Sequence, residues 1–414
     1  MKSRARLSAL VVNYNSGAFC VRCVTSVFRE WEREGRERAD LDVIVVDNAS
    51  PENQAAHLDE LEALGATVVR HDENGGYAKG MNLALTYAGG GPDDVIAVLN
   101  PDLCFLPGSL GLLMDHVHEN ERCGAVDPRA TIDPLGVLNL PRNILPTLGD
   151  QFEMGIAGLS PRICRAYSKR RLALNLPWWT AREPMRADML SGCCLFLRRS
   201  VVDAIGGLLD ERFPLYYEDT DLFRRITDKG YELVHHGGAL VLHHWSRSSG
   251  VGGSFAGEPQ RRYLISRRAY FEKWYGKSGV ALIGALDKLY SWWPAKKRFR
   301  AMHPVVELGP HTEPFTIPLP RRVDRLLIEL AVAPTWLVAV GIFGERSDHW
   351  TCPAETWDWF FQAEYFLRAI DLDTGELLGA FHVTKTIPGR NTPLTEPELE
   401  AYAERLGITA EVVA

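Results

Sequence analysis

Residues 95–106, VIAVLNPDLCFL, place a carboxylate at the end of an apolar run. The run is interrupted at Asn100, Pro101 and Asp102 and then becomes apolar again. All three residue types favour turns, so a plain turn is one interpretation. The other is that Asp102 ends a buried strand at a functional site, and two further groups of polar residues favour this second interpretation.

The next group is YYEDTDLFRR, in which Glu218, Asp219 and Asp221 occupy the first turn of a predicted helix. Acidic residues favour a helix start through the helix dipole, so a structural role stays open. The two preceding residues, Tyr216 and Tyr217, suggest that aromatic rings line one side of a site and exclude part of the water there. A carboxylate beside such a wall could take a proton from an alcohol.

The last group is VLHHWSRSS, where a predicted strand ends in His243 and His244. A single histidine at a strand end is more often structural. A pair of histidines, with Asp102 expected at the same edge of the sheet, favours a metal ligand instead.

The elements that must position these groups alternate regularly from Leu7 onward. Apolar strand-like runs are followed by stretches with helical spacing, which predicts an α/β fold with a mostly parallel sheet covered on both faces. Ser50 and Pro51 predict the start of one helix, as N-cap and first residue. The carboxyl ends of parallel strands share one edge, where ligands bind. Four polar strand ends should therefore meet in one crevice: 13–15, 47–48, 71–74 and 100–102.

The remainder of the chain predicts three further features. Residues 130–185 contain several prolines and suggest a flexible lid or acceptor loop near the site. Residues 255–300 look helical, and from Arg261 to Arg300 eleven Lys or Arg stand against two acids. Beyond residue 305 the chain is β-rich. The predicted division is therefore residues 1–255, 256–304 and 305–414.

The composition is that of an ordinary globular protein, with 46% hydrophobic and 24% charged residues. The formal charge of −7 over 414 residues argues against binding of nucleic acid through global charge. No apolar run approaches the ~20 residues of a membrane span, and no signal-peptide core follows the basic start. Cys20 and Cys23 lack partners at zinc spacing, which favours a core position over a metal site. The sequence predicts a reducing, cytoplasmic location.

Seven segments, taken in order, resemble the family 2 inverting glycosyltransferases of the GT-A fold. The resemblance covers residues 5–270 and is greatest to the rhamnosyltransferase-like branch, in which the usual Asp-x-Asp is written Asn-Pro-Asp. It implies a GT-A-type mostly parallel sheet flanked by helices, followed here by a C-terminal β-rich accessory domain outside the resemblance. The segments are VVNYNS, VVDNAS, NGGYAKGMNLAL, LNPD, LSGCCLFLRR, YYEDTDL and LHHWSRSS.

The resemblance implies a nucleotide-sugar site. Asp47 would accept a hydrogen bond from the ring N–H of the base, and Gly75 and Gly76 would let the backbone approach the donor, which a Cβ would obstruct. Lys79 and Asn82 would lie near the donor on the following helix. The full set expected to bind the donor is Val12, Asn13, Tyr14, Asn15, Asp47, Asn48, Asn74, Gly75, Gly76, Lys79, Asn82 and Asn100.

The resemblance also implies a metal site. Asp102 would bind Mg²⁺ or Mn²⁺ bridging the two phosphates, and a histidine ligand would shift the preference toward Mn²⁺. His243 best matches the family pattern His-x-x-Gly-x-Ser. Ser246 replaces the glycine of that pattern, so His244 stays a rival ligand.

The implied reaction is an in-line displacement with inversion. Asp219 would be the general base that deprotonates the acceptor hydroxyl, and Glu218 would orient the base or the acceptor. The metal would stabilise charge on the leaving group. The Asn-Pro-Asp motif favours a dTDP-activated deoxysugar such as rhamnose as the donor, although enzymes with UDP donors share the same fold and motifs. The acceptor would be a glycan or a lipid-linked saccharide in polysaccharide or cell-wall biosynthesis.

The sequence lacks the motifs of two other nucleotide-binding enzyme classes. A dehydrogenase would show G-x-G-x-x-G after the first strand, where this chain has NYNSGAFC, and a nucleotidyltransferase would show a basic glycine-rich loop. A non-catalytic nucleotide-sugar or glycan-binding protein stays open. Residues 261–300 could be a solvated helix face or a peripheral contact with the inner face of a membrane. The C-terminal domain could bind glycan, form oligomers or dock a partner.

Overall fold

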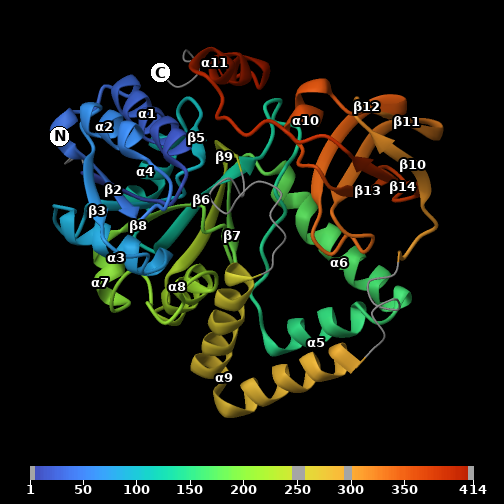
Figure 1. Ribbon diagram of the computed structural model, residues 1–414, viewed down its shortest axis with the longest axis horizontal. Helices are drawn as coiled ribbons and strands as arrows, with labels where there is room; N and C mark the ends of the chain where they lie inside the picture. Colours follow the sequence, from blue (N-terminus) through green and yellow to red (C-terminus); the bar gives the residue numbers. More distant parts are fainter. Residues whose placement is uncertain (1–4, 245–256, 293–300, 409–414) are drawn as a thin grey trace.

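The computed structural model describes residues 5–244, 257–292 and 301–408. Ser246 and residues 293–300 therefore lie outside the described residues. Two sheets form the molecule, with nine strands in the first and five in the second (Figure 1). Helix α6 (Pro161–Thr180) lies between them. The predicted α/β class with a β-rich C-terminal region is confirmed.

The first sheet has the strand order β3-β2-β1-β4-β8-β6-β9-β5, and β7 pairs with β9. Neighbours from β3 to β4 are parallel, as are β6 and β9, whereas β8, β5 and β7 run antiparallel to their neighbours. The strand bounds are β1 Leu7–Asn13, β2 Leu41–Asn48, β3 Thr67–His71, β4 Val95–Leu99, β5 Leu103–Phe105, β6 Cys123–Thr131, β7 Pro184–Ala187, β8 Cys194–Arg198 and β9 Glu232–His243.

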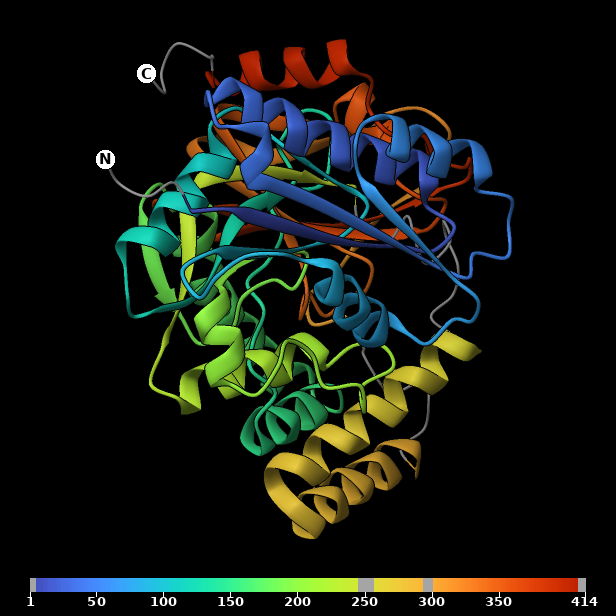
Figure 2. The ribbon, with the colours of Figure 1, turned by 90° about the vertical axis from the view of Figure 1, so that its left-hand side faces the viewer.

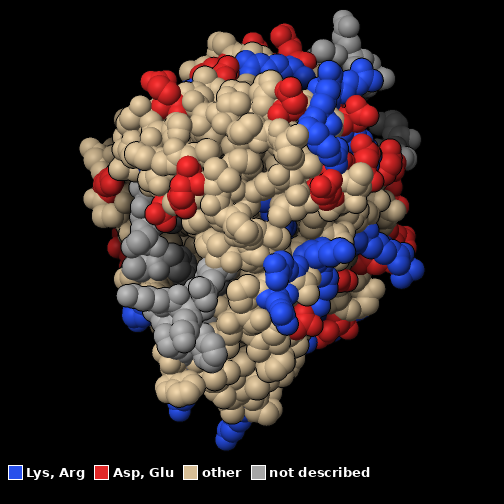
Figure 3. Space-filling model, turned by 90° about the vertical axis from the view of Figure 1, so that its right-hand side faces the viewer, with Lys and Arg blue, Asp and Glu red and all other residues tan. Residues whose placement is uncertain are grey.

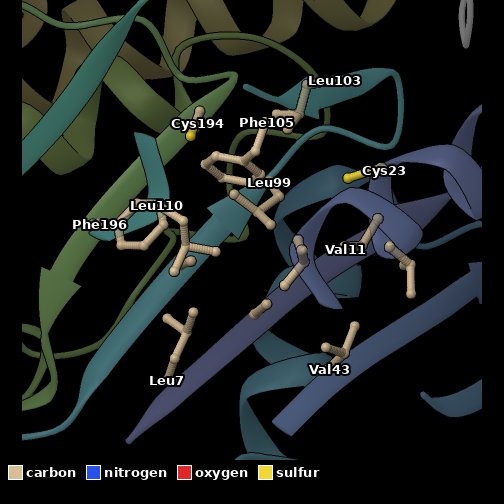
Figure 4. Close-up of a cluster of buried hydrophobic side chains, with 14 of the residues drawn as sticks. Leu7, Val11, Cys23, Val43, Leu99, Leu103, Phe105, Leu110, Cys194 and Phe196 are labelled. Atoms are coloured by element: carbon tan, nitrogen blue, oxygen red, sulfur yellow. The ribbon is translucent and has the colours of Figure 1, made fainter. Parts of the chain in front are cut away.

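Helices cover both faces of this sheet, because its strands are apolar on both sides. On one face α1 (Gly17–Arg33), α2 (Ala55–Ala63) and α4 (Ser109–Glu119) pack over a core that Figure 4 shows in part. The other face carries α3 (Tyr77–Tyr87), α7 (Arg199–Ala204) and α8 (Glu218–Asp228). Cys20 and Cys23 are both 0% exposed in the first core, as predicted.

The predicted start of α2 was wrong. The helix begins at Ala55 with Gln54 as N-cap, four residues after Pro51. Ser50 lies five residues before Ala55 and does not cap the helix: its Oγ accepts from the N–H of Asn15 at 2.9 Å, and its hydroxyl donates to Oδ1 of Asp47 at 2.7 Å. The Ser-Pro pair therefore shapes a strand-end loop rather than a helix start.

Residues 130–185 are more regular than predicted. They contain α5 (Leu148–Ala157), the long helix α6 and strand β7. Thr147 caps α5 by accepting a hydrogen bond from the N–H of Asp150 at 3.1 Å, and Pro161 opens α6 in a position where proline is tolerated. Some of the prolines thus mark helix starts rather than a loop.

The second sheet has the order β10-β14-β13-β11-β12. The turn DTGE, residues 373–376, joins β13 to β14, and the N–H of Gly375 donates to the carbonyl of Asp371 at 2.8 Å. The bounds are β10 Val306–His311, β11 Thr316–Ala331, β12 Val340–Thr351, β13 Glu364–Asp371 and β14 Leu377–Lys385, with α10 at Ala354–Trp359 and α11 at Glu396–Arg405.

The chain after the second sheet returns to the first. Glu396 of α11 forms ion pairs with Arg22 and Arg29 of α1. An apolar cluster joins the same segment to strands β5 and β9, and its members include Cys104, Leu240, Leu242, Trp359, Leu394, Leu399 and Tyr402. The C-terminal segment thus packs directly behind the strands that carry Asp102 and His243.

Helix α9 (Glu258–Trp292) stands apart from these layers. It changes direction at Gly276, whose φ of 64° and ψ of −163° are not helical. Its first half descends from the first sheet and its second half runs beneath α5 (Figures 1 and 2). Within the described part of the chain, no helix combines the length and apolar character needed to cross a bilayer.

Candidate active site

The polar ends of β1 and β2 are joined by hydrogen bonds. Asn13 donates through Nδ2 to Oδ1 of Asp47 at 2.7 Å, and the hydroxyl of Ser50 donates to the same oxygen. The N–H of Asn15, a residue with φ of 54°, donates to Oγ of Ser50 at 2.9 Å. These contacts hold Asp47 in one orientation at the edge of the sheet.

The ends of β2 and β3 meet in the same way. Asn48 donates through Nδ2 to Oδ1 of Asn74 at 3.1 Å and to the carbonyl of Gly76 at 3.2 Å. Gly76 has φ of 89°, and a Cβ there would lie 2.7 Å from the carbonyl oxygen of Pro214. Only glycine fits this position without strain. The glycine pair thus allows a close approach of the backbone to the loop before α8.

Asp102 lies in the turn between β4 and β5. Strand β5 pairs with β9 so that Leu103 lies opposite His243, which brings the preceding Asp102 to the end of β9. Oδ1 of Asp102 is 3.2 Å from Nε2 of His243, and both side chains are nearly fully buried. The turn at Pro101 therefore leads from β4, in the middle of the sheet, to β5, and places the carboxylate of Asp102 beside His243 at the end of β9.

His243 and His244 face different surroundings. The N–H of His244 donates to the carbonyl of Asp102 at 2.8 Å, and its ring packs between Phe19 and Trp359 with centroid distances of 5.1 and 5.2 Å. His243 is the histidine that lies beside the carboxylate of Asp102. His244 instead supports the turn, through its N–H and through Nδ1 of its ring, which lies 3.0 Å from the carbonyl oxygen of Asp102.

The pair of Asp102 and His243 fits a divalent cation. An octahedral cation with bonds of about 2.1 Å holds neighbouring ligand atoms about 3 Å apart, close to the separation of these two groups. Burial lowers the pKa of His243, but Cys193 and the carboxylate of Asp102 outweigh burial and raise that pKa well above its ordinary value. The site thus favours a positive charge. No cluster of three or more His, Cys, Asp or Glu among the described residues could hold a metal alone, so phosphate and water oxygens would complete the coordination.

The acidic pair of α8 lies after a strained turn. Tyr216 and Tyr217 have φ of 63° and 68°, a region that aromatic residues rarely adopt. Such strain persists where surrounding contacts hold it, and it is common at functional sites. Here the Tyr217 ring packs against the rings of Tyr263 and Tyr270 of α9, at centroid distances of 5.7 and 5.2 Å.

Glu218 and Asp219 differ in their contacts. Glu218 is 8% exposed, and its Oε2 has no hydrogen-bond partner among the described residues. Asp219 is partly exposed and accepts through Oδ1 from the N–H of Thr220 at 2.6 Å. Burial raises the pKa of both carboxyls, and the charge of Asp219 raises that of Glu218 further. Raised pKa values suit carboxylates that take up a proton.

Tyr77 links the two acidic groups. Its hydroxyl donates to Oδ1 of Asn100 at 3.2 Å, next to Asp102. Burial raises the pKa of Tyr77 well above its ordinary value, and the charges of Glu218, Asp219 and Asp102 raise it further. The charges of the α8 carboxylates and of Asp102 therefore all act on the same tyrosine hydroxyl.

Three predicted donor residues have other contacts. The side chain of Val12 is 5% exposed and packs against α3, where a Cβ on Gly80 would be 2.9 Å away. Lys79 pairs with Glu73 at 3.0 Å, and Asn82 exchanges two hydrogen bonds with the backbone of Leu209. Asn82 thus holds the loop before α8. Tyr14 is partly exposed beside Asn13.

The sequence did not predict two sets of contacts made by α9: that of Arg262 with Asn74, and those of Lys273 and Trp274 with Asp221. Nη1 of Arg262 lies 3.5 Å from Oδ1 of Asn74, which places a cation at the donor side. Asp221 is fully buried and binds Lys273 at 2.6 Å and Trp274 at 2.9 Å. The third acid of the motif is therefore an anchor for α9. Only the basic, aromatic character of residues 261–274 hinted at these contacts.

Comparison with known proteins places the chain in a family. Residues 8–171 match the family model "Glycosyl transferase family 2". The chain is 30% identical over 261 residues to the N-acetylglucosaminyl-diphospho-decaprenol L-rhamnosyltransferase of Mycobacterium tuberculosis, strains CDC 1551 / Oshkosh and ATCC 25618 / H37Rv, covering 59% of this chain and 78% of that protein. The chain belongs to glycosyltransferase family 2. It is a glycosyltransferase, and the predicted family, branch and enzyme class are confirmed.

Solved structures give more distant matches to this family 2 glycosyltransferase. GalNAc-T7 with UDP, GalNAc and Mn²⁺ is 15% identical with a TM-score of 0.45, covering 69% of this chain and 55% of that one. The mannosyltransferase PcManGT from Pyrobaculum calidifontis, in complex with GDP-Man and Mn²⁺, is 15% identical with a TM-score of 0.40, covering 71% and 77%.

Proposed function

We propose that this glycosyltransferase moves a sugar, with inversion, from a nucleotide-diphosphate donor to a hydroxyl of a glycan or lipid-linked acceptor in polysaccharide or cell-envelope biosynthesis. The pairing of Asp102 with His243 at 3.2 Å, together with the acidic pair Glu218 and Asp219 at the start of α8, carries the proposal. One pair suits a cation that neutralises the leaving diphosphate. The other suits a base that activates the acceptor.

The residues divide the reaction between them. Asp47 and the backbone of Val12–Asn15 would hold the nucleotide, and the loop of Asn74 and Gly76 would approach the donor. Asp102 and His243 would hold Mg²⁺ or Mn²⁺, which supplies positive charge to the departing phosphate when bound. Arg262 adds a fixed cation on the same side.

Asp219 would take the proton of the acceptor hydroxyl, since one of its oxygens is held by Thr220 and its side chain is the more exposed of the acidic pair. Glu218 would orient the acceptor through its unpartnered oxygen. A carboxylate whose pKa is raised by burial is a stronger base than an ordinary one, which favours this step. Attack from the face opposite the diphosphate gives inversion.

The favoured donor is dTDP-rhamnose, and a UDP-hexose is the alternative. The Asn-Pro-Asp motif and the identity to a rhamnosyltransferase support the first. The name of that relative also supports a lipid-linked acceptor. We further propose that residues 1–255, 256–304 and 305–414 act as catalytic, linking and accessory parts, the last a candidate for oligomer contacts.

A binding experiment tests the proposal. Thermal unfolding would be followed with dTDP-rhamnose, UDP-hexoses or GDP-sugars, each with and without Mn²⁺, on the wild type, D102A and the surface control D59N. A ligand at a hundredfold excess over its Kd stabilises the folded state by about 2.7 kcal/mol. We expect one nucleotide to give a Mn²⁺-dependent shift that D59N keeps and D102A loses. No shift with any nucleotide sugar would leave the non-catalytic glycan-binding protein as the better reading.

A further inference from the structure

The second half of α9 is apolar on two faces. One face carries Ile283, which is 4% exposed and belongs to a core cluster beside Leu148 of α5. The other face carries Leu282, Leu289 and Trp292, which are 38%, 43% and 80% exposed. With Ala285 between them, these residues follow the spacing of a single helical stripe. The stripe is solvated, although its composition is that of a buried surface.

Helix α5 adds to this surface. Its Phe152 and Met154 are 48% and 38% exposed, and α5 packs beside the second half of α9. We call the exposed apolar residues of the two helices the helical tip: Phe152, Met154, Leu282, Leu289 and Trp292. Figure 3 shows the lower end of the molecule, where these helices lie, as largely uncharged with Lys or Arg at its extremity. An exposed apolar patch of this kind marks an interaction site.

The charge around the tip identifies the partner. Helices α5 and α6 and the second half of α9, residues 277–292, hold seven Lys or Arg and three Asp or Glu, a net charge of +4, whereas the whole chain carries −7. The rest of the chain therefore carries −11. All three acids are held by neighbours: Asp150 by Tyr167, Glu153 by Arg170 and Asp287 by Arg267. Basic side chains beside exposed apolar ones complement an anionic lipid surface.

We propose that the helical tip inserts at the surface of an anionic bilayer and that Lys277 and Lys288, the exposed cations of the same half-helix, contact the lipid headgroups. The proposal deepens the proposed function, because a lipid-linked acceptor would be met at that surface.

The contacts of α9 connect the tip to the acidic pair. Lys273 and Trp274, just before the kink, bind Asp221 on the helix that begins with Glu218. Tyr263 packs against Tyr217, directly before that helix. A bilayer beneath the tip would therefore have a fixed position relative to the base that activates the acceptor.

Vesicle flotation tests the proposal on the full chain. We expect binding to vesicles of phosphatidylglycerol and phosphatidylcholine, weak binding to pure phosphatidylcholine, and release as salt rises. L282S/L289S/W292S should lower the partition coefficient at least tenfold. The matched control is L64S/L112S/L377S, which removes leucines of 36%, 38% and 36% exposure on other elements and should bind like the wild type. K277Q/K288Q should lower the partition coefficient roughly fivefold for each charge removed.

Several outcomes would overturn the proposal: no vesicle binding, equal loss in the control variant, or a wild-type dimer that becomes a monomer in the tip variant. The last, seen by light scattering, would make the tip an interface between two copies. Thermal shifts with nucleotide sugars, measured without vesicles, distinguish failure of the membrane proposal from failure of the proposed function. If the tip variant shows the same thermal shift with the donor as the wild type, the substitutions affect membrane binding and not the donor site.

Discussion

Glu218→Gln is expected to make the protein more stable and less active at the same time. The side chain is 8% exposed, and Oε2 has no hydrogen-bond partner among the described residues. Burial, followed by the charge of Asp219, raises the pKa of Glu218 well above its ordinary value. The folded state therefore holds the proton of Glu218 more tightly than the unfolded chain does.

The sign of the pH effect follows from this difference. An unfolded Glu ionises near pH 4.3. Above that pH the unfolded state gains from ionisation before the folded state does, so wild-type stability falls as pH rises toward the raised pKa of Glu218. Glutamine has no proton to lose and keeps the shape of the side chain. The stability difference between E218Q and the wild type should therefore grow from pH 4 upward and level off above the raised pKa.

Glutamine is equally unpartnered at this position, so the gain comes only from the ionisation that it lacks. A buried charge without a partner costs more than a neutral polar group, which costs about 1–3 kcal/mol, and this cost sets the scale of the gain. In chains of 150–250 residues each kcal/mol raises Tm by about 2–4 °C, and less in a longer chain. Calorimetry at pH 5 and pH 8 would measure the gain in E218Q, with the exposed E60Q as a control that should not change. Turnover by E218Q should fall, because the acceptor loses its orienting carboxylate. A lower Tm for E218Q at pH 8 would refute the reasoning.

Three further predictions concern neighbouring contacts. A Cβ at Gly192 would lie 2.7 Å from Oδ2 of Asp219, so G192A should lower kcat by at least tenfold while donor binding, measured by calorimetry, stays within twofold; a normal kcat would contradict the assignment of Asp219. D221N should weaken the hold of Lys273 on α8 and increase protease cleavage within α9, an effect that the exposed D59N should not show. Lys385 is fully buried and donates to the carbonyl groups of Trp357 and Phe360, so K385M should cost about 1–3 kcal/mol in urea unfolding without changing donor affinity; unchanged stability would count against it.

The sequence predicted those parts of the site that follow from local patterns. Polar residues after apolar strands predicted that these strand ends would meet, because parallel strands share an edge, and hydrogen bonds join the ends of β1, β2 and β3. The acids after Tyr216 and Tyr217 announced the start of α8, which begins at Glu218. Thr395 and Glu398 form a capping box at the start of α11, and this spacing in a sequence indicates where a helix begins.

Tertiary contacts decided the rest. Ser50 had the features of a helix cap, but its oxygen accepts from the N–H of Asn15 and its hydroxyl donates to Asp47, so that it joins the ends of β1 and β2 instead. Asp221 matched its two acidic neighbours in type and position, yet only its contact with α9 separates it from them. Tyr77 gave no signal at all, since its hydrogen bond to Asn100 joins two segments that are far apart in the sequence.

The return of residues 394–402 to strands β5 and β9 has a consequence for synthesis. Leu240 and Leu242 lie next to His243, and they are covered by Leu394, Leu399 and Tyr402, which the ribosome makes more than 150 residues later. A nascent chain that has finished the catalytic sheet still exposes that apolar strip beside the proposed metal ligands. The enzyme thus gains its complete core only when this late segment has emerged, and until then the growing chain is open to premature association or to capture by a chaperone.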